Sequence, residues 1–162
     1  MGKTARKVIS KKQTIMDIFQ TGNTFNTRRF KQGHARKVWR EMRLRLPAGG
    51  KVLNITDWVS KGKIPAGTPA KYEVDPDTGA KKITCYTNEQ VKAATAGDSA
   101  AGVASLSIKG NIQEDIPIVN GETVGTATVI YDGELYEYML DPDVATALKT
   151  ITDNDYRVLL VR

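Results

Sequence analysis

The sequence predicts a mainly β protein, a small barrel- or sandwich-like domain with one or two short helices, preceded by an extended basic N-terminal arm. Two observations predict it. From residue 51 onward, short apolar stretches are separated about every ten residues by Gly, Pro, Asn and Asp. The charge is also divided: residues 1–50 carry 13 Lys and Arg and two acids, whereas residues 51–162 carry 11 and 16. Net charges of +11 and −5 define an arm, 1–50, and a body domain, 51–162.

The arm is expected to contain two short helices. Residues 14–20 have amphipathic spacing, but a helix of that length is not stable alone in water. Residues 34–46 are expected to form the second helix, because Val38, Met42 and Leu46 recur at four-residue intervals. The segment Pro47-Ala48-Gly49-Gly50 ends this helix and marks the boundary of the arm.

The body is expected to consist mostly of strands and hairpins. Turn chemistry places them at 51–59, at 71–74 and 82–86 around the turn 75–79, at 101–108, at 116–119 before Asn120-Gly121, at 126–131 and 134–139 around Asp132-Gly133, and at 155–161. Residues 88–96 predict one helix. A second is expected to begin with Asp141 as its N-cap and Pro142 at its first position.

The arm combines arginine with apolar anchors, which favours binding of an anionic partner over simple solubility. Arginine makes bidentate contacts with carboxylates and phosphates, and the interspersed apolar side chains can dock on a surface. The predicted partner-binding residues are Lys11, Lys12, Ile15, Phe19, Arg28, Arg29, Phe30, Lys31, Arg36, Lys37, Trp39, Arg40, Arg43 and Arg45.

Three tyrosines cluster near Asp132-Gly133: Tyr131, Tyr136 and Tyr138. Tyr136 and Tyr138 lie two residues apart, so they share one face if that segment is a strand. Such a face either packs on the core of its own domain or forms an aromatic patch at a subunit interface, where Tyr is enriched.

The body lacks the histidine that a serine or cysteine nucleophile would need. The one histidine, His34, lies in the arm, so the body has no imidazole to activate a serine or Cys85. Acid pairs such as Asp141/Asp143 and Asp153/Asp155 read as turn and helix caps, not as metal ligands. We therefore expect no enzyme, no catalytic residue, no metal and no cofactor.

Membrane association is not expected either. No apolar run approaches the ~20 residues of a membrane span. The basic N-terminus lacks the apolar region of a secretory signal. We expect a soluble protein made in a reducing compartment, with Cys85 as a buried, inert thiol.

Three stretches of the body resemble capsid decoration proteins of tailed bacteriophages. They are GKIPAGTP at 62–69, AAGV at 100–103, and IPIVNG at 116–121 followed by VGTATVIYDGE at 124–134. The resemblance implies a compact β-rich domain on the outside of a phage head, often a homotrimer, that stabilises the shell or carries a fibre.

The 50-residue basic arm departs from the short N-terminal segment of typical members. It favours an auxiliary capsid or head-fibre-anchoring protein, made in the host cytoplasm and located in the virion, whose arm is bound to the major capsid protein or other virion proteins. The alternative is a nucleic-acid-binding protein, in which the arm neutralises phosphates and Trp39 or Phe30 stacks on bases.

Overall fold

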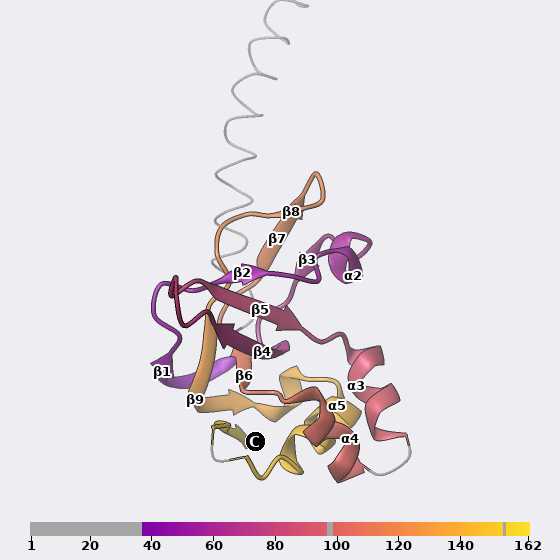
Figure 1. The fold of residues 1–162 in the computed structure, drawn as a ribbon. Coiled ribbons are helices and arrows are strands. Elements are labelled where there is room, and N and C mark those ends of the chain that lie inside the picture. Colours follow the sequence, from indigo (N-terminus) through magenta and orange to yellow (C-terminus); the bar gives the residue numbers. More distant parts are fainter. Residues whose placement is uncertain (1–36, 97–98, 154) are drawn as a thin grey trace, which may run out of the picture. The chain divides into compact units, whose positions relative to one another are not determined.

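The computed structural model describes residues 37–96, 99–153 and 155–162, which belong to a compact unit beginning at Lys37. The mainly β prediction is confirmed. The elements, labelled in Figure 1, are β1 (Trp39–Arg45), β2 (Lys51–Val52), α2 (Thr56–Val59), β3 (Lys63–Ile64), β4 (Pro69–Val74), β5 (Lys81–Cys85), α3 (Asn88–Thr95), α4 (Ser99–Leu106), β6 (Gly110–Ile112), β7 (Ile116–Val119), β8 (Glu122–Thr123), β9 (Val129–Tyr136), η1 (Glu137–Met139), α5 (Pro142–Lys149) and β10 (Arg157–Val161).

Strand β9 pairs with three strands of the large sheet, whose order is β1-β9-β6-β4-β5-β2, with β10 also paired to β9. Strand β1 pairs antiparallel with one edge of β9. The opposite edge is shared: β6 pairs with Val129 and Ile130, and β10 runs parallel to residues Asp132 to Tyr136. Both β1 and β10 are therefore outer strands on either side of β9. A smaller sheet has the order β3-β7-β8.

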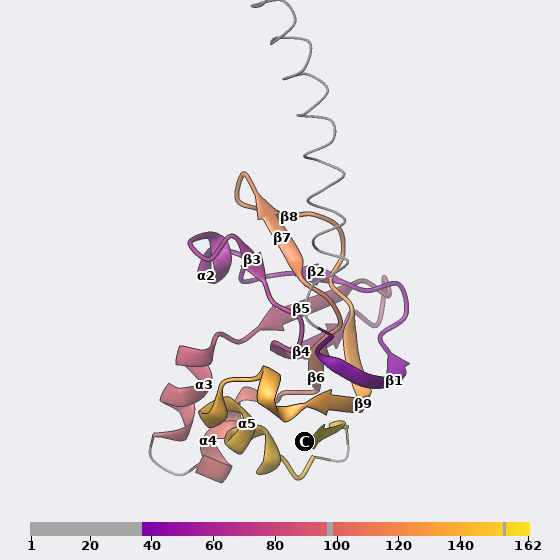
Figure 2. The ribbon, with the colours of Figure 1, turned by 180° about the vertical axis from the view of Figure 1, so that it is seen from behind.

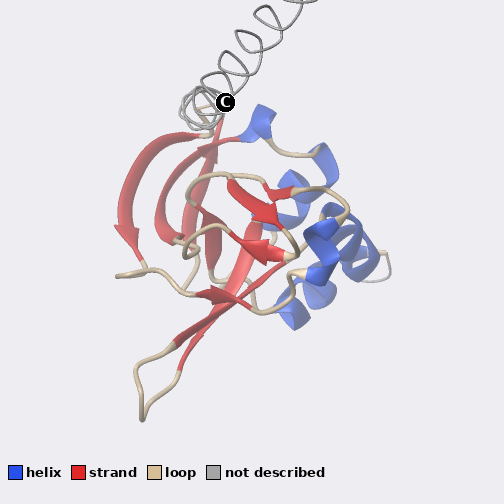
Figure 3. Ribbon diagram, turned by 90° about the horizontal axis from the view of Figure 1, so that it is seen from above, coloured by secondary structure: helices blue, strands red, loops and turns tan. Residues whose placement is uncertain are grey.

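Helices α3, α4 and α5 gather at one side of the body (Figures 2 and 3). The β7–β8 hairpin projects from the body away from these helices. The three helices enclose a cluster of buried side chains that includes Val91, Val103 and Leu148. A second cluster lies under β2, β4, β5 and β6. The third, here called the β9 cluster, joins β1, β9 and β10 and consists of Val38, Trp39, Ile130, Leu135 and Val158.

The predicted boundary of the arm is wrong for residues 37–50, which belong to the body. The predicted helix over 34–46 is also wrong for its described part, since Trp39–Arg45 is strand β1. Its four-residue spacing is not a helical stripe, because Val38 and Leu46 are buried whereas Met42 is 50% exposed. Pairing with β9 supplies the backbone hydrogen bonds, so tertiary context overrides the local pattern.

Residues 101–108 were expected to be a strand, but 99–106 form helix α4. The physical reason is the run of small residues. A Cβ at Gly102 would lie 1.7 Å from the carbonyl oxygen of Ala94, so glycine here allows α4 to pack directly on α3. The strand expected over 51–59 is likewise limited to β2, and α2 follows it. The described residues thus hold four α-helices, more than the one or two expected.

The predicted hairpin at Asp132-Gly133 is also wrong, because β9 continues through both residues. Glycine is needed at position 133 because the backbone of β1 approaches closely, and not because the chain turns there. A Cβ at this position would lie 2.6 Å from the carbonyl oxygen of Glu41 on β1. The strand expected over 134–139 is strand only as far as Tyr136, the end of β9, and Glu137–Met139 form the 3₁₀ turn η1.

Other local predictions are confirmed. Strands β4 and β5 form the hairpin around the turn at 75–79. Asn120 and Gly121 both have positive φ, 52° and 79°, as a two-residue hairpin turn requires. Helix α5 begins after Asp141, whose carboxylate accepts from the backbone N–H of Asp143 at 3.0 Å, and Pro142 occupies its first turn.

Candidate partner-binding surface

Nine of the predicted partner-binding residues lie outside the described residues: Lys11, Lys12, Ile15, Phe19, Arg28, Arg29, Phe30, Lys31 and Arg36. The other five, Lys37, Trp39, Arg40, Arg43 and Arg45, lie on or beside β1. The structure separates these five into three groups with different surroundings.

Trp39 is a core residue, so its predicted role as an exposed anchor is wrong. It is 5% exposed and belongs to the β9 cluster. Its indole Nε1–H donates to the carbonyl oxygen of Ile112, 3.3 Å away. The indole is therefore not available to stack on a base or to dock on a partner.

Arg40 and Arg43 are held by acids of the same chain. The Arg43 guanidinium lies 2.8 Å from Glu134, 3.1 Å from Glu41 and 3.4 Å from Asp132. Arg40 Nε lies 3.5 Å from the second oxygen of Glu134. The hydrogen bond to Glu41, followed by the nearby carboxylate charges, raises the pKa of Arg43 above its ordinary value.

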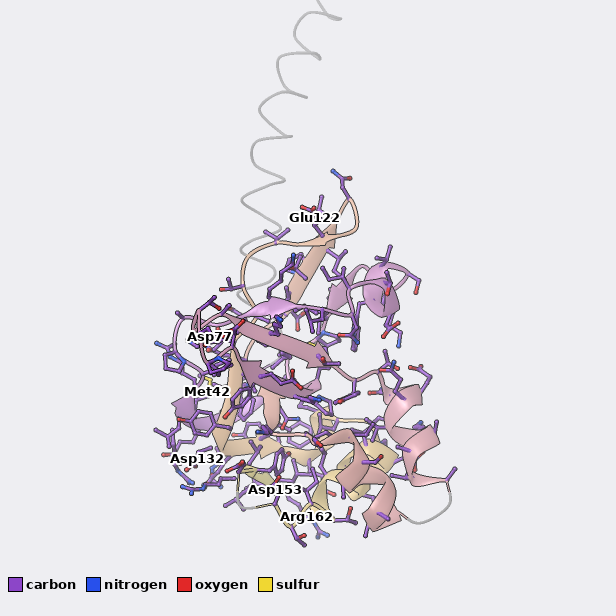
Figure 4. The ribbon with its side chains drawn as sticks, in the orientation of Figure 1. Met42, Asp77, Glu122, Asp132, Asp153 and Arg162 are labelled. Atoms are coloured by element: carbon purple, nitrogen blue, oxygen red, sulfur yellow. The ribbon has the colours of Figure 1, made fainter. Side chains whose placement is uncertain are left out.

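This ion-pair network links the outer face of β1 to that of β9. Figure 4 shows Asp132 at the margin of the body, on the side where β1 and β9 lie. Because both arginines are already paired, they are not free cations of the kind that we predicted for a partner-binding arm.

Lys37 and Arg45, at the two ends of β1, are different. Both are exposed, and within the described part of the chain neither forms an ion pair. Arg45 lines an open groove with Leu44, Pro47 and Thr126. Among the five described residues of the predicted set, Lys37 and Arg45 are therefore the ones that an anionic group of a partner can reach without displacing an ion pair.

The three tyrosines do not form one cluster. The Tyr131 ring faces Tyr72, with ring centroids 6.4 Å apart, and is half-buried. The rings of Tyr136 and Tyr138 lie next to each other at the end of β9, with their centroids 5.3 Å apart. Tyr138 is 68% exposed, whereas Tyr131 and Tyr136 are half-buried, so Tyr138 is the most accessible of the three.

The sequence reasoning missed the surface beside this pair. Val161 on β10 is the register partner of Tyr136, and Leu159 lies two residues earlier on the same face. Leu159 is 56% exposed. The four residues form a continuous strip, here called the apolar strip: Leu159, Val161, Tyr136 and Tyr138. The apolar run at 158–161 is the signal in the sequence, but the topology is needed to show which side chains face out.

The side chains of the body that could take part in chemistry are buried or take part in local hydrogen bonds. Cys85 is buried, as expected, and burial raises its pKa to about 12, so the thiol is protonated at neutral pH. Asp153 accepts from the backbone N–H of Asp155, in keeping with its predicted capping role. Among the described residues, no group of three or more His, Cys, Asp or Glu could hold a metal ion. None of the helices described has the length and hydrophobicity to cross a membrane.

Two of the hollows in the described part of the chain lie between helices and neighbouring segments. One of about 260 Å³ lies among Trp58, Pro65 and the beginnings of α3 and α5. Lys61 at its rim lies 5.3 Å from the Trp58 ring and pairs with Glu89 at 2.9 Å. The other, about 250 Å³, lies between α4 and the segment after α5. Neither places an unpaired ionisable group among convergent polar side chains.

Comparison with known proteins found no matching family, no matching curated protein and no matching solved structure.

Proposed function

We propose that this chain is a structural virion protein that decorates or stabilises a phage capsid, as an auxiliary capsid or head-fibre-anchoring protein. The body lies outside the shell, and the N-terminal segment attaches it to the major capsid protein or to another virion protein. The chain is synthesised in the host cytoplasm and forms homo-oligomers in the virion. The resemblance at 62–69, 100–103 and 116–134 supports the class of protein.

One observation carries the attachment role. Residues 1–36 contain nine Lys and Arg and one acid, a net charge of +8, whereas residues 37–162 contain 15 and 17, a net charge of −2. Within the body, Arg40 and Arg43 are neutralised by Glu41, Asp132 and Glu134. The excess of positive charge in the sequence thus lies before β1, and an acidic surface is the partner that it fits.

Strand β1 supports this role mechanically. A segment that holds a domain on a shell must be joined firmly to that domain. Strand β1 begins three residues after residue 36 and pairs with β9. It buries Trp39 and is joined to β9 by the ion pairs of Arg43. Force applied to residues 1–36 is therefore transmitted through β1 to β9, which pairs with three strands of the large sheet.

The test is co-sedimentation of the full chain with shells of the major capsid protein from the same genome. Arg28→Glu combined with Arg29→Glu should reduce the bound fraction at least about tenfold. The matched control, Lys51→Glu combined with Lys82→Glu, makes the same charge change on exposed strand residues of the body and should bind normally. Equal binding of all three proteins would refute the attachment role.

Nucleic acid is the alternative partner, favoured by the adjacent Arg28, Arg29 and Phe30, which could contact phosphates and stack on a base. Trp39 no longer supports it, because that side chain is buried. Binding of the full chain to DNA and RNA measured against salt separates the two. A slope of log K on log salt near about −5 indicates phosphate contacts; no binding at low salt leaves protein as the partner.

A further inference from the structure

The β7–β8 hairpin extends beyond the strand that flanks its base. Strand β3 pairs only with the first two residues of β7, and Ile118 adds one backbone hydrogen bond to Gly62. Beyond Ile118 the two strands pair only with each other, Val119 opposite Glu122, and the hairpin projects from the body (Figure 1). A two-stranded hairpin with nothing packed against it has little stability of its own in water. Covering the outer part of this hairpin would therefore stabilise it.

One face of the hairpin is apolar apart from a single acid. Side chains alternate between the two faces of a strand, and register partners share a face. Ile118 packs against the buried cluster under β2, β4, β5 and β6, so its face points inward. The opposite face, here called the hairpin face, consists of Pro117, Val119, Glu122 and Val124. Val119 and Val124 are 55% and 54% exposed, and Glu122, labelled in Figure 4, is exposed and forms no ion pair with a described residue.

The open groove at the end of β1 has complementary properties. It measures about 650 Å³ and is lined by residues 43–49 and by two threonines that follow β8. Leu44, which is 45% exposed, and Pro47 give it apolar surface. Arg45 lines it, and Lys81 lies at its edge, because the Lys81 ammonium donates to the carbonyl oxygen of Pro47. No acid lines the groove, and neither Arg45 nor Lys81 forms an ion pair within the described part of the chain.

The hairpin of a copy does not fill the groove of that same copy. Val119 and Val124 remain more than half exposed in the structure in which the groove is open. The base of the hairpin is held in place by the pairing of β7 with β3. Both surfaces are therefore left for another molecule.

We propose that the hairpin face of one copy docks in the groove of a second copy of this chain. The valines of the hairpin face then pack on Leu44 and Pro47, and Glu122 pairs with Arg45.

Charge identifies a second copy as the occupant. Residues 116–126 contain one acid, Glu122, and no Lys or Arg, whereas the groove has two cations without an ion pair and no acid. Two grooves facing each other would bring like charges together, and so would two hairpin faces, so charge favours the unlike pairing. Because every copy carries both surfaces, a solution of the chain alone contains both partners.

The contact deepens the homo-oligomeric part of the proposed function and rests on it, but it does not involve residues 1–36. It joins two different surfaces, so it is heterologous, and each added copy presents a further hairpin or groove until a ring closes. Failure of this contact would appear in the mass of the chain alone, whereas failure of attachment would appear only in binding to shells.

The experiment is light scattering coupled to size exclusion on the full chain, without capsid or nucleic acid, over about 1 to 200 µM. We expect a species of at least twice the 17.8 kDa chain mass. Glu122→Arg and Arg45→Glu should each weaken assembly at least about tenfold, because each places like charges opposite each other. The matched control is Asp143→Arg, which makes the same charge change as Glu122→Arg on a side chain of α5 that is 72% exposed; this variant should assemble normally.

Mixing the two variants tests whether the contact joins different copies. In an equal mixture, the unchanged Glu122 of one variant meets the unchanged Arg45 of the other, so a species containing both variants should return. The double variant should also assemble, because its charges are exchanged and still opposite. A contact within one chain would predict no recovery in the mixture. A wild-type monomer up to 200 µM, equal loss in Asp143→Arg, or no recovery in the mixture would overturn the proposal.

Discussion

Replacing Trp39 by alanine tests whether the body begins at β1. The side chain is 5% exposed, in contact with the β9 cluster. Burying about 200 Å² of indole at about 25 cal/mol per Å² contributes on the order of 5 kcal/mol, and measured Trp→Ala losses in cores are about 3 to 5 kcal/mol. We expect Trp39→Ala to lower the free energy of unfolding by that amount, which would leave a domain of this size close to unfolded.

Trp39→Phe separates packing from hydrogen bonding. Phenylalanine keeps most of the apolar contact but loses the bond to the Ile112 carbonyl. That carbonyl still accepts from the backbone N–H of Gly67 at 2.8 Å, so no buried acceptor is left without a partner. The expected loss is therefore about 1 kcal/mol, near the average for one hydrogen bond.

The assay is urea unfolding followed by far-ultraviolet circular dichroism, because Trp39 is one of two tryptophans and its removal changes the fluorescence. Met42→Ala is the control: it removes a large side chain from the same strand, but one that is 50% exposed, and should cost less than about 1 kcal/mol. If Trp39→Ala cost no more than Met42→Ala, Trp39 would be a surface residue and the assignment of 37–50 to the body would fail.

Three further predictions concern packing, ionisation and reactivity. Gly102→Ala should cost at least about 2 kcal/mol in urea unfolding, because the new Cβ would lie 1.7 Å from the Ala94 carbonyl oxygen; Gly79→Ala, in open space at φ 69°, should cost about 1. Lys61→Ala should raise the pKa of Glu89 from about 2 towards its ordinary 4.5, measured by NMR titration. Since that pKa is lowered in the folded state, the contribution of Glu89 to stability is complete above about pH 4.5 and is lost as the pH falls through about 2. Cys85 should react with a thiol reagent at pH 8 only after unfolding, since burial raises its pKa to about 12; rapid reaction of the native protein would contradict this.

Local chemistry predicted the elements whose cause is local. Asn120-Gly121 forms its turn because both residues accept positive φ, and Asp141 with Pro142 starts α5 because capping needs only adjacent residues. Asp132-Gly133 has similar turn chemistry, yet it lies within β9. The cause there is a contact with Glu41, 92 residues away in sequence, that no local pattern contains.

The candidate surface was less predictable than the fold class. The arginines of β1 were recognised as a charged group, but their pairing depends on Asp132 and Glu134, which topology brings beside them. Leu159 belongs to an apolar run that reads as a buried strand. Its exposure follows from the position of β10 at the margin of the sheet, and strand order could not be read from the sequence.

The most direct test of the attachment role is a competition for shells between the wild-type chain and the Arg28→Glu, Arg29→Glu variant, mixed in equal amounts at limiting shell concentration. Mass spectrometry of the washed shells measures the ratio retained. The proposed function predicts at least about a tenfold excess of the wild-type chain, and an even ratio for the Lys51→Glu, Lys82→Glu control. An even ratio for the variant with substitutions at positions 28 and 29 would contradict it.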